Sequence, residues 1–209
     1  MTDNPDEFIP TRQSLLSRLK DWEDQESWRR FFDTYWRLIY NAALKAGLTE
    51  TEAQDVVQET LISVAKKMPG FKYDPAIDSF KGWLFYQTRL RIADQFRKRR
   101  QAGAQNRRAS DDAARTATIQ RVADPASLDL DAIWDEEWRV NLMHAATARV
   151  KAQVSPEQYE MFYLYVIKEM TVRQVASRLG VNAAQIYLAK HRISRLLNKE
   201  IRKLEKEGF

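Results

Sequence analysis

Six aromatic side chains fall within the sixteen residues 71–86, with cations between and after them. The aromatics are Phe71, Tyr73, Phe80, Trp83, Phe85 and Tyr86, and the cations are Lys72, Lys81 and Arg89. Aromatic faces stack on unpaired bases at about 1–3 kcal/mol per base, and nearby cations follow the phosphates. We expect Phe80 and Leu84 to be core, with Trp83 largely so, whereas Tyr73 and Tyr86 are freer to face a nucleic acid.

Four consecutive cations follow this segment: Arg97, Lys98, Arg99 and Arg100. Cations at the end of a helix can offset its negative dipole end, but four in a row suit the phosphates of a polyanion better. Residues 89–108 hold eight basic side chains and one acid, Asp94. The sequence therefore predicts a cationic stripe beside the aromatic segment.

A second polyanion-binding element is predicted near the C-terminus. Ser155, Thr171 and Asn182 are each followed three residues later by Gln, which is the pattern of a capped helix start. The short helix Thr171–Leu179 ends at Gly180, where a positive φ permits a steep turn into the next helix. This arrangement is typical of a helix-turn-helix.

The second helix of this motif carries a face that could read DNA. Its apolar positions form one stripe for the core, and residues 185–206 add seven Lys or Arg and His191 against two Glu. Near the helix start, Leu188 suits a thymine methyl and Arg192 suits guanine, whereas Arg195 suits phosphate. A charged, solvated helix is the alternative, and His191 is as easily a plain surface residue. The candidates for this surface are Arg173, Gln185, Tyr187, Leu188, His191, Arg192 and Arg195.

A different kind of surface is predicted on a helix that a capping box at Thr49 and Glu52 opens. Its apolar stripe is Ala53, Val56, Val57, Leu61 and Val64. Offset from that stripe, Asp55, Gln58, Glu59 and Ile62 follow helical spacing and form an acidic face with one apolar residue. This face suits docking to a protein, although an exposed acidic helix face is often only solvated.

These candidate sites lie on helices, so we predict an all-α fold of two small helical domains. The 209 residues include only six Gly and six Pro, and no stretch alternates like a strand. Residues 101–130 lack aromatics and balance four basic with four acidic side chains, which indicates a flexible linker. The expected division is a tail at 1–10, domains at 11–100 and 131–209, and the linker between them.

Composition excludes several functional classes. There is no Cys, so disulfides, thiol nucleophiles and thiolate metal sites are absent, and the two His, at 144 and 191, are scattered. Neither a Walker loop nor a zinc pattern is present, so we expect no catalytic residue, no metal, no cofactor and no enzyme. The net charge of +5 allows a polyanion partner. The acidic N-terminus lacks a secretion pattern and no apolar run is long enough for a membrane, so a cytoplasmic protein is expected.

The motifs together resemble a bacterial RNA polymerase sigma factor of the extracytoplasmic-function group. The string Asp55-Val56-Val57-Gln58-Glu59-Thr60 is followed by Phe80-Lys81-Gly82-Trp83-Leu84, the basic run and the helix-turn-helix, over roughly residues 11–205. The resemblance implies transcription initiation: the acidic face would bind the coiled coil of the polymerase β′ subunit. It further implies β as a partner and admits an anti-sigma protein, and it gives no reason to expect a homo-oligomer.

The resemblance also assigns the DNA contacts. The first domain would melt the promoter's minus-ten element, and the helix from Ala183 would read the minus-35 element. The residues implied at the minus-ten element are Lys72, Tyr73, Lys81, Trp83, Tyr86, Arg89, Arg97, Lys98, Arg99 and Arg100. The main alternative is a stand-alone helix-turn-helix regulator that binds duplex DNA without polymerase, but it leaves the acidic face and the aromatic segment without a role.

Overall fold

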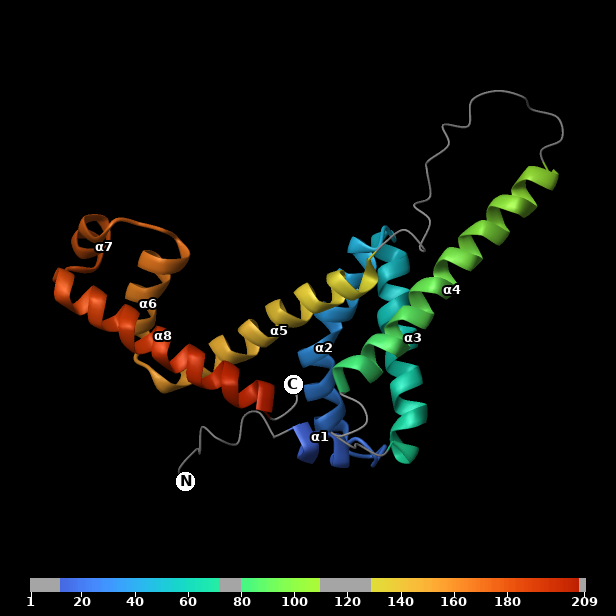
Figure 1. Ribbon diagram of the computed structural model, residues 1–209, viewed down its shortest axis with the longest axis horizontal. Coiled ribbons are helices and arrows are strands. Elements are labelled where there is room, and N and C mark those ends of the chain that lie inside the picture. Colours follow the sequence, from blue (N-terminus) through green and yellow to red (C-terminus); the bar gives the residue numbers. More distant parts are fainter. Residues whose placement is uncertain (1–11, 72–79, 110–128, 207–209) are drawn as a thin grey trace. The chain divides into compact units, whose positions relative to one another are not determined.

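The structure, a computed structural model, describes residues 12–71, 80–109 and 129–206. Within these ranges the chain forms α-helices and no strand, which confirms the all-α prediction (Figure 1). The helices are α1 (Arg12–Arg18), α2 (Gln25–Lys45), α3 (Glu50–Lys67), α4 (Phe80–Ala109), α5 (Leu130–Gln153), α6 (Pro156–Phe162), α7 (Val172–Leu179) and α8 (Ala183–Lys206). A 3₁₀ turn at Met68–Gly70 follows α3, and a π-helical turn at Tyr163–Ile167 follows α6. None of the helices in the described ranges is both long and apolar enough to cross a membrane.

The chain divides into two compact units, and the boundary lies inside α5. One unit comprises residues 14–141, and the described part of the other comprises 12–13 and 142–206. The sequence predicts residues 131–141 in the second domain, whereas the structure groups them with the first. It also predicts that the first domain ends at 100, whereas α4 continues to Ala109 because Ala, Gln and Arg favour helix. Of the predicted linker 101–130, residues 110–128 lie outside the described ranges.

The first unit is built on α2, α3 and α4. Asp24 caps α2 by accepting the Ser27 N–H at 3.0 Å, and Arg18 Nε donates to Asp24 Oδ2 at 2.7 Å. The hydrogen bond from Arg18, followed by that from Ser27, lowers the pKa of Asp24 to about 2. The core contains fully buried side chains from each of the three helices: Phe31, Leu38, Ile39, Val56, Val64, Phe80, Leu84 and Phe96. Phe80 and Leu84 thus occupy the core positions predicted for them.

The first half of α5 completes this unit. Trp134 and Trp138 are 2% and 4% exposed, and their rings lie 5.4 Å from Phe85 and 6.0 Å from Tyr35. Glu137 lies between them in the sequence and is buried. Its carboxylate lies 2.5 Å from Lys45 Nζ and accepts a hydrogen bond from Asn41 Nδ2 at 3.0 Å. The hydrogen bond to Glu137 raises the pKa of Lys45. Residues 130–141 are therefore part of the core of the first unit.

The second unit packs the later half of α5, α6 and α7 against α8. Val175, Ile186 and Ile193 are fully buried, and Leu164, Ala189 and Leu204 nearly so. Glu200 is 6% exposed and accepts from Gln153 Nε2 at 3.1 Å, with Arg149 Nη1 at 3.5 Å. The apolar stripe predicted along the last helix thus faces this core.

Candidate nucleic-acid and protein interfaces

The exposed ridge of α3 carries the predicted docking residues. The predicted capping box is present: Thr49 accepts the Glu52 N–H at 3.3 Å, and Glu52 Oε2 accepts the Thr49 N–H at 2.8 Å. With the helix start fixed in this way, Val56, Val57 and Val64 turn inward. Asp55 and Gln58 are exposed, Glu59 is half-buried and Ile62 is 46% exposed.

Glu59 is not an isolated acid, because Lys98 Nζ on α4 donates to its Oε1 at 2.9 Å. That hydrogen bond raises the pKa of Lys98. A residue predicted to bind protein is thus paired with one predicted to bind DNA, 39 positions further along the chain. The two predicted surfaces meet at this pair.

Other cations of the run 97–100 are paired as well. Arg97 Nη2 lies 2.7 Å from Asp94 Oδ1, and the Arg99 guanidinium binds both carboxylate oxygens of Glu52. The hydrogen bond from Arg99 is the main reason that the pKa of Glu52 falls to about 2. Arg99 therefore links the middle of α4 to the first turn of α3 by an ion pair. Arg100, by contrast, is exposed and has no ion pair within the described residues.

The aromatic segment separates into packed and exposed rings. The Trp83 ring lies 4.5 Å from Phe71 and 5.6 Å from Phe80, and it is half-buried. Tyr86 is 57% exposed and Arg89 is exposed. Lys72 and Tyr73, also predicted for this surface, lie outside the described residues.

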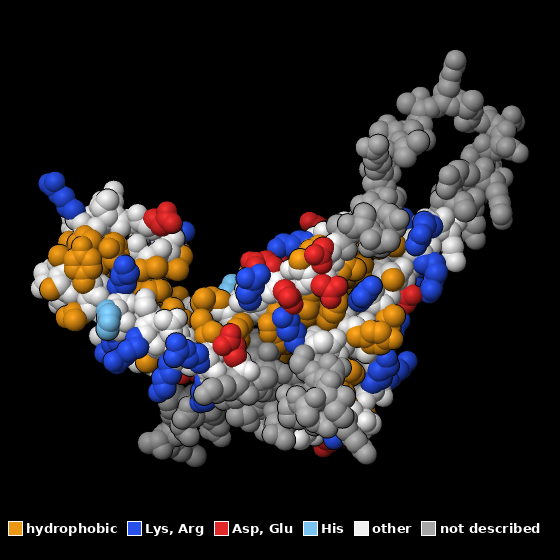
Figure 2. Space-filling view, viewed as in Figure 1, with side chains coloured by type: hydrophobic (Ala, Val, Ile, Leu, Met, Phe, Trp, Pro, Cys, Tyr) orange, Lys and Arg blue, Asp and Glu red, His pale blue; other side chains and the backbone are white. Residues whose placement is uncertain are grey.

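The first half of α5 reaches two members of this segment. Lys81 Nζ lies 2.7 Å from Asp135 Oδ1, and Phe85 packs on Trp134. On the face of this unit that Figure 2 shows, acidic and basic side chains are interleaved. Lys81 is thus an ion-paired residue here, and Tyr86, Arg89 and Arg100 are the more open candidates.

In the second unit, the helix-turn-helix has the predicted caps and turn. Thr171 and Gln174 form a capping box, and Gly180 ends α7 with φ 67° in the left-handed region. Asn182 and Gln185 exchange side-chain-to-backbone hydrogen bonds, each of 2.9 Å. Because Gln185 Oε1 accepts the Asn182 N–H, the Gln185 side chain presents its NH₂ group outward as a donor.

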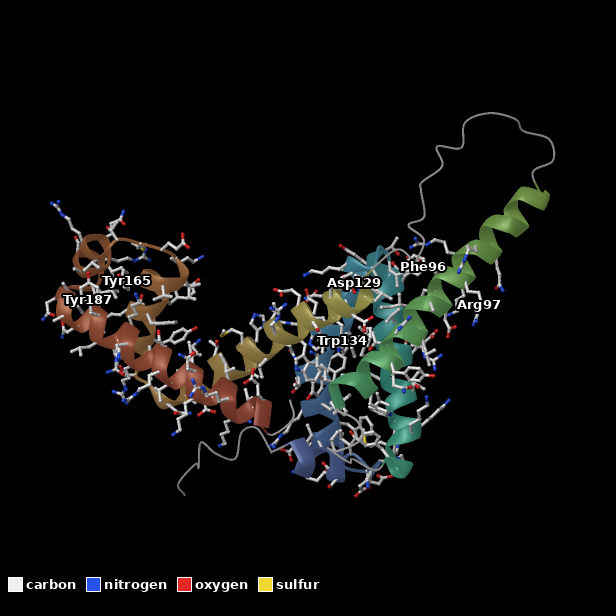
Figure 3. The ribbon with its side chains drawn as sticks, viewed as in Figure 1. Phe96, Arg97, Asp129, Trp134, Tyr165 and Tyr187 are labelled. Carbon is white, nitrogen blue, oxygen red and sulfur yellow. The ribbon has the colours of Figure 1, made fainter. Side chains whose placement is uncertain are left out.

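The residues predicted to contact DNA in this unit are all exposed. Arg173, Gln185, His191, Arg192 and Arg195 are exposed, and Leu188 is 69% exposed. Tyr187 is 52% exposed and packs edge-to-face on Tyr165, with ring centres 5.9 Å apart (Figure 3). A hollow of about 470 Å³ brings together Gln158, Met161, Gln185, Leu188, Ala189, His191, Arg192 and Arg195.

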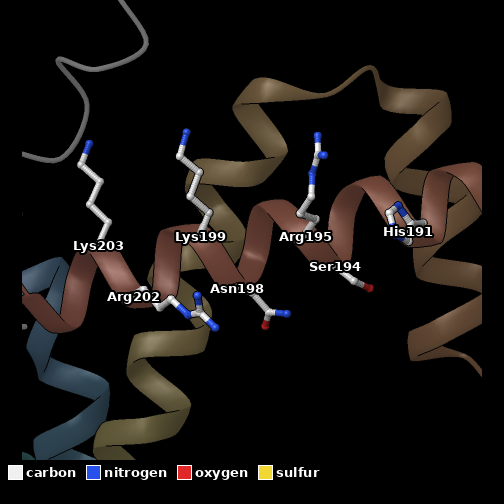
Figure 4. Close-up of a pocket in the computed structure, with 7 residues that line it drawn as sticks. All are labelled: His191, Ser194, Arg195, Asn198, Lys199, Arg202 and Lys203. Atoms are coloured by element: carbon white, nitrogen blue, oxygen red, sulfur yellow. The ribbon is translucent and has the colours of Figure 1, made fainter.

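A second hollow continues along α8 beyond the predicted residues. It has about 780 Å³ and is lined by His191, Ser194, Arg195, Asn198, Lys199, Arg202 and Lys203 (Figure 4). Arg195, Lys199 and Lys203 recur every four residues and extend to the same side of the helix in Figure 4. The candidate residues that sequence reasoning did not single out here are Lys199, Arg202 and Lys203, although the charge count of 185–206 signalled them.

An aromatic groove between α2 and α3 was also missed. Phe32 and Trp36 stack with ring centres 6.1 Å apart, and the Arg37 guanidinium lies 5.2 Å from the centre of the Trp36 ring. The groove has about 580 Å³ and is lined by Phe32, Trp36, Tyr40, Gln54, Val57, Gln58 and Leu61. Aromatics at positions 32, 36 and 40 follow a four-residue spacing, which could have revealed the groove. Because Gln58 lines it, the groove adjoins the exposed ridge of α3.

Metal chemistry finds no support in the described part of the chain, where no group of three or more His, Cys, Asp or Glu could hold an ion. Both units carry surfaces on which aromatic, apolar and charged side chains are mixed, a composition that is typical of macromolecular interfaces.

Comparison with known proteins bears on the first unit. Residues 31–102, which cover α2 from Phe31, α3 and most of α4, match the sigma-70 region 2 family. No curated protein sequence matches the chain. A solved chain in the structure of CnrH in complex with the cytosolic domain of CnrY is similar at 17% identity, with 92% of this chain and 98% of that chain covered and a TM-score of 0.36. The region 2 match confirms the resemblance to sigma factors that the sequence motifs indicate.

Proposed function

We propose that this chain, a sigma factor by its sigma-70 region 2 domain, belongs to the extracytoplasmic-function group and delivers RNA polymerase to promoters through one protein contact and two DNA contacts. Polymerase catalyses RNA synthesis, and this chain recognises the promoter. The observation that carries the proposal is the presence, in one chain, of a region 2 domain and a helix-turn-helix whose second helix is exposed at each position expected to contact bases.

The protein contact is assigned to the ridge of α3. Asp55, Gln58, Glu59 and Ile62 lie on one side of the helix, and the adjoining aromatic groove widens the apolar part of this surface. A coiled coil of the polymerase β′ subunit that presents basic and apolar side chains would complement it. Ile62, 46% exposed with no core role, is the apolar anchor.

The minus-ten contact is assigned to the outer side of α4 and the segment before it. Tyr86 offers a ring for stacking, and Arg89 and Arg100 offer charges for the backbone of an opened strand. Stacking on unpaired bases lowers the free-energy cost of strand separation, which is how a protein without catalytic groups can favour melting.

The minus-35 contact is assigned to the start of α8. Leu188 and Arg192 are exposed and would contact base edges. Arg195, Lys199 and Lys203 extend to one side of α8 and would contact the phosphates of the DNA backbone. Gln185, with its oxygen engaged in the cap, would bind acceptors such as purine N7.

The decisive experiment reconstitutes transcription with purified core RNA polymerase. We expect the chain to be retained by core polymerase and to start run-off transcripts at defined places on genomic fragments, whereas core polymerase alone does not. The double substitution Asp55→Ala with Glu59→Ala should weaken retention while the fold is kept. Glu23→Ala, an exposed glutamate in the same unit, is the matched control. Duplex binding without retention by polymerase would instead indicate a stand-alone regulator.

A further inference from the structure

A small basic pocket lies between α3 and α4, beyond the acidic end of the docking ridge. It has about 310 Å³ and is lined by Glu59, Ile62, Ser63, Lys66, Lys67 and Arg91. Three cations and one carboxylate thus face this pocket, and the carboxylate is already bound by Lys98. Lys66 is exposed and makes no hydrogen bond or ion pair within the described residues.

A buried glutamine holds the pocket in shape. Gln87 is 2% exposed, and its Oε1 accepts from Lys67 Nζ at 2.7 Å and from Ser63 Oγ at 3.1 Å. The Lys67 ammonium is therefore fixed at the pocket wall and keeps two donors for another acceptor. A charge held in place in this way loses little side-chain entropy when a ligand binds.

Arg91 also has donor capacity to spare. Its Nη1 lies 3.1 Å from Asp94, its Nη2 lies 3.5 Å from Ser63, and its buried Nε has no partner among the described residues. Asp94 is in addition shared with Arg97. The pocket therefore lacks enough acceptors for the cations that line it.

The charge of the side chains on the α3 ridge consequently changes from acidic to basic along the helix. Asp55, Glu59, Ile62 and Lys66 follow spacings of four, three and four residues, so they succeed one another on one side of the helix. We propose that the basic pocket receives an Asp or Glu side chain of the polymerase segment that docks on α3. This inference rests on the proposed function, and it adds an acidic contact to the complementary basic one.

A protein carboxylate fits this pocket better than a DNA phosphate does. The pocket is lined in part by the exposed Ile62 and by Glu59, and Asp55 lies one turn further along α3. A continuous phosphate backbone would pass these acids with one charge after another, whereas a protein surface can place a single carboxylate in the pocket and basic or apolar side chains beside the acids. The order of charges also sets a direction: the bound segment must place its basic residues near Asp55 and its acid near Lys66.

The test measures binding of the full chain to core polymerase. Lys66→Glu should weaken binding at least about tenfold, because it places a like charge against the incoming carboxylate. Lys20→Glu, an exposed lysine elsewhere in the same unit, should change it less than about twofold. A carbodiimide, which joins an amine directly to a contacting carboxylate, should link wild-type Lys66 or Lys67 to an Asp or Glu of a polymerase subunit.

Each other outcome overturns the inference in a distinguishable way. If Asp55→Ala with Glu59→Ala weakens binding to polymerase and Lys66→Glu does not, the assignment of the α3 ridge to docking is supported. The proposed contact between the basic pocket and an acidic side chain of polymerase is then wrong. If neither variant weakens binding to polymerase, the assignment of the α3 ridge to docking is also wrong. If Lys66→Glu weakens binding of the chain to promoter duplex and leaves polymerase binding intact, the pocket holds a phosphate. The crosslink on wild-type protein decides the matter where Lys66→Glu lowers the unfolding temperature.

Discussion

A substitution of Trp134 tests whether the first half of α5 is part of the core of the first unit. The Trp134 indole is 2% exposed, and its ring lies 5.4 Å from Phe85 and 6.2 Å from Trp138. We expect Trp134→Ala to destabilise the unit formed by residues 14–141 and to leave the unit formed by residues 142–206 unchanged. The division of the chain into two compact units makes these outcomes separable.

The magnitude follows from the buried area. A buried tryptophan covers about 200 Å², and at about 25 cal/mol/Å² its removal costs about 5 kcal/mol. The buried indole N–H has no hydrogen-bond partner within the described residues, so the substitution also relieves an unfavourable group worth about 1 kcal/mol. The expected loss is therefore about 4 kcal/mol, within the range of about 3–5 kcal/mol for deletion of a large core side chain.

Hydrogen exchange resolved by peptide is the suitable assay, because a single unfolding curve mixes the two units. A loss of about 4 kcal/mol lowers amide protection by about 1000-fold, and we expect this in peptides from α3 and α4 but not from α8. Trp22→Ala is the control, because Trp22 is 68% exposed. A loss below about 1 kcal/mol for Trp134→Ala would refute the reasoning, since α5 would then not be part of this core.

Three further predictions concern single substitutions. Arg192→Ala should weaken promoter binding by about 1–3 kcal/mol and relax specificity at one base pair, whereas an equal loss on every duplex would make Arg192 a phosphate contact. Hydrogen bonding to Arg99 lowers the pKa of Glu52 from 4.5 to about 2, so its stabilisation is complete above about pH 4.5 and is lost as the pH falls toward 2. The gap between the urea midpoints of wild type and Glu52→Gln should therefore shrink over that interval, and a constant gap would contradict the ion pair. Gly180→Ala should cost about 1 kcal/mol in thermal unfolding because φ is 67° with no atom near the new Cβ, and an unchanged midpoint would exclude backbone strain there.

Local features of the fold could be predicted because their causes are local. The capping boxes at Thr49 and Thr171 and the left-handed turn at Gly180 each depend on residues no more than four positions apart. The buried stripe of α3 follows from helical periodicity once the first residue of the helix is known. For the same reason, the exposure of Asp55, Gln58 and Ile62 could be anticipated.

The position of the first half of α5 could not be predicted in this way. Trp134, Glu137 and Trp138 form an apolar helix face with a buried acid, a pattern that suits either neighbouring domain. What settles it is Glu137, whose carboxylate is held by Asn41 and Lys45, 96 and 92 positions away in the sequence. A buried carboxylate needs such partners, yet the sequence does not show which ones it finds.

Charge pairing limits what a count of cations can say about DNA binding. The run 97–100 contains four cations, but Arg97, Lys98 and Arg99 are bound to Asp94, Glu59 and Glu52. A phosphate contact by any of them exchanges one ion pair for another, and an exposed pair contributes only about 0–1 kcal/mol in either case. Counterion release per contact is correspondingly smaller than for an unpaired cation. Under the proposed function, we therefore expect the electrostatic contribution of the first unit to promoter binding to come mainly from exposed cations that have no ion pair within the described residues, such as Arg89 and Arg100. We expect its contribution to strand separation to come from an exposed ring such as Tyr86.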